Sequence, residues 1–195
     1  GPDEYDLAGA VTGVVEADAV LGPDRVHAGD VVVAMAASGL HSNGYSLVRQ
    51  VVFDIAGWKL DRHVPELSRT LGEELLTPTR IYAPHCLALA AANDVDVHAM
   101  AHVTGGGLAA NLARVLPSHL SARIDRGTWK PPPVVDLLAS LGRIEQAELE
   151  RTLNMGVGMV AVVSSETADT RIVPTLWLRC RRFFTVRYGA MTTSS

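Results

Sequence analysis

The chain has 195 residues, enough for one sizeable core, and 48% of them are apolar while 19% are charged. This balance is ordinary for a soluble globular protein. A net charge of -4 lacks the basic footprint of a protein that binds nucleic acid or an anionic membrane. No apolar run approaches the roughly 20 residues of a membrane span, and no signal-peptide pattern opens the chain. The two cysteines fit neither a metal-ligand spacing nor a disulfide framework, so we expect a cytoplasmic protein with reduced thiols.

The chain begins with a weak predicted strand at Leu7–Glu16, which has no earlier strand to pair with, so we expect a segment missing upstream. Asp30–Ala37 predicts a buried strand and Tyr45–Phe53 an amphipathic helix, followed by a polar surface connection at 57–69. The remaining predicted elements are helices at Leu71–Leu76, Pro84–Asn93, Leu108–Leu116, Val134–Leu141 and Ala147–Thr152, and strands at Asp96–Val103, Ser121–Asp125 and Met159–Val163. Together they predict an α/β (α+β) fold, a mixed β-sheet with flanking helices.

The loop Ser38–Gly44 lies between a predicted core strand and a predicted helix. In open α/β sheets this is where ligands bind, and free backbone N–H groups at a helix start favour an anion. We therefore expect a phosphate or carboxylate site there. The alternative is a simple turn in which Ser42 or Asn43 caps the following helix.

Two further glycine-rich junctions accompany this loop, at Thr104–Gly107 and at Asn154–Gly158. Glycine permits positive φ and close approach of a ligand, and successive N–H groups form anion-binding concavities. None of the three junctions matches the P-loop or the dinucleotide fingerprint. The sequence thus predicts phosphate binding without a named nucleotide motif.

Several polar residues are candidates for chemistry. His41 lies in the first loop, where a neutral imidazole would hydrogen-bond a substrate and a protonated one would pair with phosphate. His98 and His102 are expected to share one face of a strand, but no third ligand is obvious, so we expect no metal site. Glu4 and Asp6 could hold Mg²⁺, although acids at a chain end are more often solvated.

Residues 171–195 differ in composition from the rest of the chain. They contain five arginines, no acidic residue and several aromatic residues, without a clear helical or strand period. One interpretation is a basic partner-binding tail. The other is that this stretch is not the natural continuation of the domain and follows a change of reading frame near Asp169–Thr170.

The three junctions, with their flanking strings, resemble the phosphoribosylformylglycinamidine cyclo-ligase family, the aminoimidazole ribonucleotide synthetases. The matching segments follow one another in order at consistent spacing. They are Glu4–Gly9, Gly13–Glu16, Ala28–Val31, Ser38–Leu47, Leu76–Tyr82, Val97–His102, Thr104–Gly107, Arg114–Pro117, Arg151–Thr152 and Asn154–Met159.

This resemblance implies ATP-dependent ring closure of formylglycinamidine ribonucleotide, giving aminoimidazole ribonucleotide, ADP and phosphate. Such a reaction depends mostly on positioning and charge stabilisation, helped by Mg²⁺. The resemblance also implies a homodimer in the full-length family and an N-terminal domain, absent here, that supplies most of the nucleotide site. We therefore expect residues 1–25 to be a remnant of that domain and linker, 26–169 the synthetase C-terminal domain, and 170–195 a divergent tail.

We expect the isolated chain to have little or no cyclisation activity. His41 is the candidate catalytic residue. The candidate substrate- and phosphate-binding residues are Ser38, Gly39, His41, Ser42, Asn43, Gly44, Thr104, Gly105, Gly106, Gly107, Asn154, Gly156 and Gly158. Two alternatives remain open: a non-catalytic interaction module that uses the tail, and a superfamily relative that phosphorylates another substrate.

Overall fold

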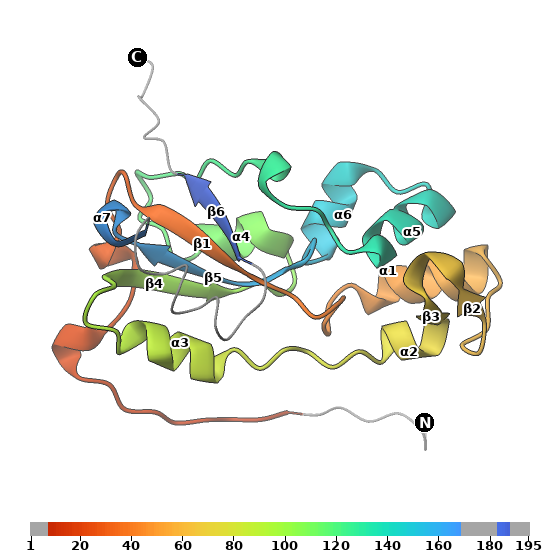
Figure 1. Ribbon diagram of the computed structural model, residues 1–195, viewed down its shortest axis with the longest axis horizontal. Helices are drawn as coiled ribbons and strands as arrows, with labels where there is room; N and C mark the ends of the chain where they lie inside the picture. Colours follow the sequence, from red (N-terminus) through yellow and green to blue (C-terminus); the bar gives the residue numbers. More distant parts are fainter. Residues whose placement is uncertain (1–7, 169–182, 188–195) are drawn as a thin grey trace, which may run out of the picture.

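The computed structural model describes residues 8–168 and the backbone of 183–187. Its main sheet has the order β4-β5-β1-β6 (Figure 1). The strands are β1 (Val31–Ala36), β4 (Val97–His102), β5 (Val157–Val163) and β6 (Phe183–Arg187), and a separate small ribbon joins β2 (His63–Val64) to β3 (Arg69–Thr70). Every hydrogen-bonded pair is antiparallel, so β1 and β4 point the same way on either side of β5.

The helices surround this sheet and extend beyond one end of it (Figure 1). The α-helices are α1 (Tyr45–Arg49), α2 (Leu71–Leu75), α3 (Ala83–Ala90), α4 (Gly107–Ala113), α5 (Pro133–Gly142), α6 (Gln146–Thr152) and α7 (Ser165–Ala168). A π-helix, η3 (Gln50–Ile55), continues α1, and short 3-10 turns lie at Ala17–Ala19, Pro23–Arg25, Pro65–Leu67 and Arg126–Thr128. Within the described ranges, no helix is long and apolar enough to cross a lipid bilayer.

Strand β1 is buried along its whole length because helices cover both faces of the sheet. On one face, Val32 and Ala34 pack in a cluster with Leu108 and Leu112 of α4. On the other, β1 side chains pack with residues of α3. A strand covered on both sides shows a continuous apolar run instead of alternation, as the sequence predicted here. The predicted α/β (α+β) class is confirmed.

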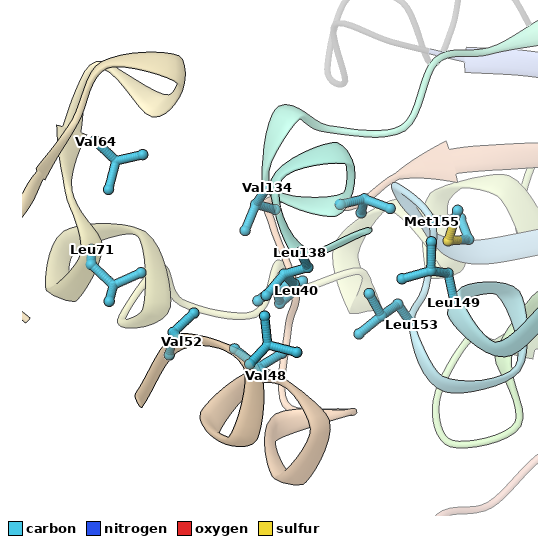
Figure 2. Close-up of a cluster of buried hydrophobic side chains, with 12 residues drawn as sticks. Leu40, Val48, Val52, Val64, Leu71, Val134, Leu138, Leu149, Leu153 and Met155 are labelled. Atoms are coloured by element: carbon cyan, nitrogen blue, oxygen red, sulfur yellow. The ribbon is translucent and has the colours of Figure 1, made fainter. Parts of the chain in front are cut away.

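A third hydrophobic cluster lies beyond the end of the sheet, where α1, η3, α5 and α6 meet the small β2–β3 ribbon (Figure 2). Leu40 reaches it from the loop that follows β1, and Leu153 and Met155 reach it from the chain that precedes β5. Burying these side chains anchors both loops to the helical layer, at about 25 cal/mol for each Å² of apolar surface removed from water.

Two predicted strands are wrong. Residues 8–16 have no secondary structure and are exposed, with Val11 and Val14 each 98% accessible, because no described strand lies beside them to accept hydrogen bonds. Residues Ser121–Asp125 also form no strand, and Ile124 instead packs against the cluster under α4. Residue 7, the acids Glu4 and Asp6, and the tail apart from the 183–187 backbone lie outside the described residues.

The expectation that His98 and His102 share a strand face stays a prediction, but the two residues differ in their surroundings. The β4–β5 register shifts between Val97 and Ala99, so His98 is an extra residue in a β-bulge. His98 is buried, whereas His102 is exposed at the other end of the strand. The surface connection predicted at 57–69 is mostly exposed but contains β2 and the start of β3.

Candidate functional site

The three glycine-rich junctions meet at one end of the sheet. Ala36 pairs with Val157 and His102 pairs with Met159, so the C-terminal ends of β1 and β4 lie beside the N-terminal end of β5. The ladder continues into the junctions: the Ala37 amide donates to the Gly156 carbonyl over 2.8 Å. We call residues 38–44, 104–107 and 154–158 the three-loop surface. Antiparallel pairing with β5 brings these distant segments together.

Asn154 joins two of the loops from inside. Its side-chain Nδ2 donates to the Gly39 carbonyl over 2.9 Å, and its Oδ1 accepts from the Gly156 amide over 2.8 Å. The side chain is buried, so both ends of the amide are directed into the protein. A buried amide that satisfies two backbone groups fixes loop geometry, and Asn154 is therefore a positioning residue of this surface.

His41 is buried beneath the first loop with φ of 59°, a left-handed conformation uncommon for a residue with a side chain. Its Nε2 accepts a hydrogen bond from the Ser38 amide over 3.1 Å, so the proton of the neutral ring is on Nδ1. Burial lowers the pKa of His41 to about 4, helped by the charges of His102 and Arg80. The ring is therefore neutral at pH 7, and of the two roles left open by the sequence, the neutral hydrogen-bonding one fits.

The Nδ1 atom of His41 has no hydrogen-bond partner among the described residues, although it is buried. Leaving a buried N–H donor unsatisfied costs about 1–3 kcal/mol. A ligand or water oxygen at this position would recover that energy. His41 thus presents one oriented donor under the three-loop surface.

Tyr82 belongs to the same site although the sequence did not single it out as a site residue. Its hydroxyl donates to the Ala36 carbonyl over 2.8 Å, and its ring centroid lies 6.0 Å from that of His41 and 6.1 Å from that of His102. A Cβ atom on Gly158 would overlap the Tyr82 hydroxyl, so only glycine permits this approach. The buried ring closes the floor beneath His41.

The segment Leu76–Tyr82 lines the first loop along its outer side. Ser38 Oγ donates to the Pro78 carbonyl over 2.6 Å, and Ser42 Oγ lies 3.1 Å from Thr79 Oγ1. The sequence did contain a signal for this segment, the string LTPTRIY. That string supported the family resemblance, but it was not taken as part of the predicted site. Through these contacts the segment borders the candidate site, beside the three loops.

Asn111, on α4, shapes the glycine loop and was also missed. Its Nδ2 donates to the carbonyls of Gly107 over 2.7 Å and of Thr104 and Gly105 over 3.2 Å each. In a trans peptide unit the N–H points opposite to the C=O. Binding of these carbonyls by Asn111 therefore directs the amides of Gly105, Gly106 and Leu108 away from the Asn111 side chain. The available signal was an asparagine among the alanines and leucines of a predicted helix, and in the structure this asparagine is buried.

Gly107 brings α4 against α6. Its φ is 70°, and a Cβ atom there would overlap the backbone carbonyl of Glu150. Asn43 of the first loop lies beside the glycine loop, with Oδ1 4.0 Å from where a Cβ of Gly105 would stand. The loop at 38–44 and the loop at 104–107 thus form one continuous outer face.

The predicted site residues differ in what they present to solvent. Those that are exposed or half-buried can touch a ligand on the surface, whereas those that are buried lie beneath it, and of these His41 keeps a ring nitrogen without a partner among the described residues. The first group is Ser38, Ser42, Asn43, Gly44, Thr104, Gly105, Gly106 and Gly156, and the second is Gly39, His41, Gly107, Asn154 and Gly158.

A cavity of about 400 Å³ adjoins the three-loop surface at Ser38, Gly39 and Gly156. Charges of both signs line it: Arg69 and Lys130 contribute cations, and Glu66 and Glu74 contribute carboxylates. Arg69 is partly neutralised by Glu74, at 3.6 Å. Lys130 is the cation there that makes no ion pair with another described residue.

Residues 27–172 match the family model described as "AIR synthase related protein, C-terminal domain". The chain therefore belongs to this family. It is 63% identical over 147 residues to a Streptomyces fradiae protein provisionally named phosphoribosylformylglycinamidine cyclo-ligase, covering 75% of this chain and 80% of that protein.

Two relatives carry the same name without qualification. The Sorangium cellulosum protein is 50% identical over 169 residues, and the Geotalea uraniireducens protein is 43% identical over 171 residues. These alignments cover 87% and 88% of this chain and 49% of each relative. The chain thus spans about half the length of these curated relatives.

Proposed function

We propose that this chain forms the substrate-facing part of a cyclo-ligase that closes formylglycinamidine ribonucleotide to aminoimidazole ribonucleotide with ATP. The observation that carries the proposal is the face of outward-turned amides that Asn111 creates in the glycine loop. Such a face binds anions through backbone dipoles. Membership of the family and the names of the relatives support the reaction class.

In this proposal the amides of Gly105 and Gly106, with the neighbouring Asn43 and Ser42, hold phosphate oxygens of the ribonucleotide. His41 stays neutral because of its lowered pKa and donates from Nδ1 to a substrate oxygen. A neutral donor stabilises developing negative charge without having to exchange a proton. Tyr82 and Asn154 keep His41 and its loop in place.

ATP supplies the activating phosphoryl group when bound. Groups at the three-loop surface that donate hydrogen bonds to phosphate oxygens fit that task. The described residues do not fit a Mg²⁺ ion at this surface. Oxygen ligands are what Mg²⁺ prefers, but no group of three acidic or histidine side chains gathers there within the described part of the chain. We therefore assign nucleotide and Mg²⁺ binding mostly to a separate nucleotide-binding part, and derive no step through the metal here.

The proposal extends to the organisation of the protein. Residues 26–169 act as the synthetase C-terminal domain, preceded by a remnant of the nucleotide-binding domain and linker, and the complete enzyme works as a homodimer in the cytoplasm. Residues 170–195 are a divergent tail. The family match, which runs from 27 to 172, supports the central boundary.

Calorimetric titration of the chain with aminoimidazole ribonucleotide tests the proposal. We expect binding that weakens in Asn43→Ala and is unaffected in His119→Ala, which changes an exposed histidine outside the loops. AMP, which has the phosphate but a different base, should bind more weakly. A thermal-shift screen of other phosphorylated metabolites then tests the alternative, phosphoryl transfer to another substrate. A larger rise in Tm with a non-purine compound than with aminoimidazole ribonucleotide would favour that alternative.

Turnover provides the second test. With ATP, Mg²⁺ and substrate, the chain alone should give no product above background, and adding the N-terminal half of the Sorangium cellulosum relative should restore some. Robust turnover by the chain alone would contradict the assignment of the nucleotide site to another part. Failure of aminoimidazole ribonucleotide to bind would contradict the substrate-facing role itself.

A further inference from the structure

A second group of polar side chains lies at the opposite end of the sheet from the three-loop surface. His27, Asp30 and His98 each offer one ligand atom, and these atoms all lie within 4.8 Å of one another. Asp30 and His98 are buried, whereas His27 is exposed at the rim. Nothing in the proposed reaction uses these residues.

The local backbone explains why they converge. The turn before β1 is closed by the His27 amide, which donates to Asp30 Oδ2 over 2.8 Å, and by the Asp30 amide, which donates to the His27 carbonyl over 3.2 Å. The Gly22 amide donates to the His98 carbonyl over 2.9 Å and holds this segment against β4. The bulge in β4 directs His98 to the turn.

The contacts of His98 have the form of a metal ligand with its supporting carboxylate. Its Nδ1 lies 2.6 Å from Asp30 Oδ2, and its Nε2 lies 3.1 Å from Asp96 Oδ2. Histidines that bind metals almost always donate their other ring N–H to a carboxylate, which fixes the tautomer and orients the ring. Asp96 fills that place here, and Arg25 in turn lies 3.6 Å from Asp96.

We propose that His27, Asp30 and His98 bind a divalent first-row transition-metal ion such as Zn²⁺. Two imidazole nitrogens and one carboxylate oxygen are ligands that suit Zn²⁺, and a water would complete four-coordination. On binding, the cation takes the place of the proton between His98 Nδ1 and Asp30 Oδ2. That proton is released to solvent, while the Nε2 proton stays hydrogen-bonded to Asp96.

The consequence of this site is a cross-link between segments far apart in sequence. It joins the turn before β1 to the beginning of β4, at the end of the sheet that lies away from the candidate active site. An ion that binds the folded chain and not the unfolded one raises the free energy of unfolding with the logarithm of its concentration over Kd. This inference is independent of the proposed reaction.

Zinc titration of the full, untagged chain tests the proposal, with calorimetry for affinity and Co²⁺ absorption for geometry. We expect one Zn²⁺ per chain, a rise in Tm on adding Zn²⁺, and visible Co²⁺ bands that Zn²⁺ displaces. His27→Ala should lower the Zn²⁺ affinity by about 10-fold or more, and Asp96→Asn by about 10- to 100-fold. His27 and Asp96 are exposed, so both variants should fold.

His119→Ala is the matched control, because it removes an exposed histidine that is not part of the cluster and should leave the Zn²⁺ affinity and the Co²⁺ spectrum unchanged. The proposal is overturned if no stoichiometric Zn²⁺ binds. It is equally overturned if His27→Ala and His119→Ala bind Zn²⁺ as the original chain does, because the cluster is then only a hydrogen-bonded pair that ties the turn to β4.

Discussion

Gly158 lies against the ring of His41 so closely that a Cβ atom at position 158 would stand 2.6 Å from Cε1 of the imidazole. The same atom would overlap the hydroxyl of Tyr82 on the other side. Both rings are buried, so neither can move aside into open space. A single backbone position therefore determines how His41 is held.

Gly158→Ala should push His41 and Tyr82 apart. Overpacking of this kind costs about 1–3 kcal/mol, and the displaced imidazole should also weaken binding of aminoimidazole ribonucleotide. Urea unfolding and calorimetric titration measure the two effects. Gly13→Ala is the control, since nothing lies within 4 Å of a Cβ there. A Gly158→Ala chain as stable as the original would refute the close approach.

Asn111→Ala should remove the group that turns the glycine-loop carbonyls inward. Losing donors to buried carbonyls costs about 1–3 kcal/mol of unfolding free energy, and the freed loop should bind phosphate more weakly. Chemical denaturation and a titration with inorganic phosphate test both. Asn93→Ala changes an exposed asparagine and should do neither. Unaltered phosphate binding in Asn111→Ala would show that the outward amides are not the anion site.

The pKa of His41 predicts a specific pH dependence of stability. The folded value, about 4, is below the ordinary value of 6.5, so between these two pH values the unfolded chain binds a proton that the folded chain does not. Stability should therefore fall as the pH drops from about 6.5 to about 4, by an amount on the order of 3 kcal/mol, and show no contribution from this group above pH 7.

His41→Asn provides the comparison, because asparagine tolerates the left-handed backbone but does not titrate. The difference in unfolding free energy between the two chains, measured from pH 4 to 8, isolates His41 from the other histidines. A difference that stays constant over this range would mean that the folded-state pKa of His41 is not lowered.

Substitutions of Asn154 and Asn43 should distinguish a residue that holds the loops in place from a residue that contacts the ligand. Asn154→Ala removes two buried hydrogen bonds and should cost about 1–3 kcal/mol of stability. Asn43→Ala should leave stability almost unchanged and weaken ligand binding, since Asn43 is half-buried on the outer face. Thermal unfolding with and without aminoimidazole ribonucleotide compares the pair. The reverse pattern, with stability lost only in Asn43→Ala, would contradict these assignments.

Removing residues 171–195 tests the interaction-module alternative. Strand β6 pairs with Val31–Met35 of β1 at one edge of the sheet, and none of these paired residues belongs to the three-loop surface. Binding of aminoimidazole ribonucleotide should thus survive the deletion, whereas the uncovered edge of β1 should promote self-association. Light scattering and titration measure these outcomes. Loss of ligand binding would instead place the functional surface in the tail.

Much of the fold could be predicted because the patterns were local. The apolar run before Ser38 predicted β1, and the alternation before Val103 predicted β4. Apolar segments without a partner misled the prediction: Leu7–Glu16 has strand composition, but a strand requires a neighbour. Which residues of a short helix are buried was not predicted either: in α3, Leu87 is 70% exposed, while Leu89 is buried.

The parts of the site that escaped the sequence depend on contacts between distant segments. Asn111 acts on carbonyls four to seven positions earlier, from the inner face of a helix, and Tyr82 reaches the end of β1 from 46 residues away. The bulge at His98 interrupts the β4–β5 register, and strand alternation in the sequence gives no sign of it. Glycine spacing could indicate that loops exist, but only the pairing of β5 with both neighbours shows that they meet.

Asn111 binds the carbonyls of Thr104, Gly105 and Gly107, so in the proposed function the glycine loop offers backbone N–H groups to a phosphate. Ion pairs between exposed charges weaken as salt is added, whereas fixed peptide dipoles carry no mobile counterions. Phosphate held in this way should remain bound across a wide range of ionic strength. If the proposed phosphate site is confirmed, the surface would select for the shape of a phosphate group and not only for its charge.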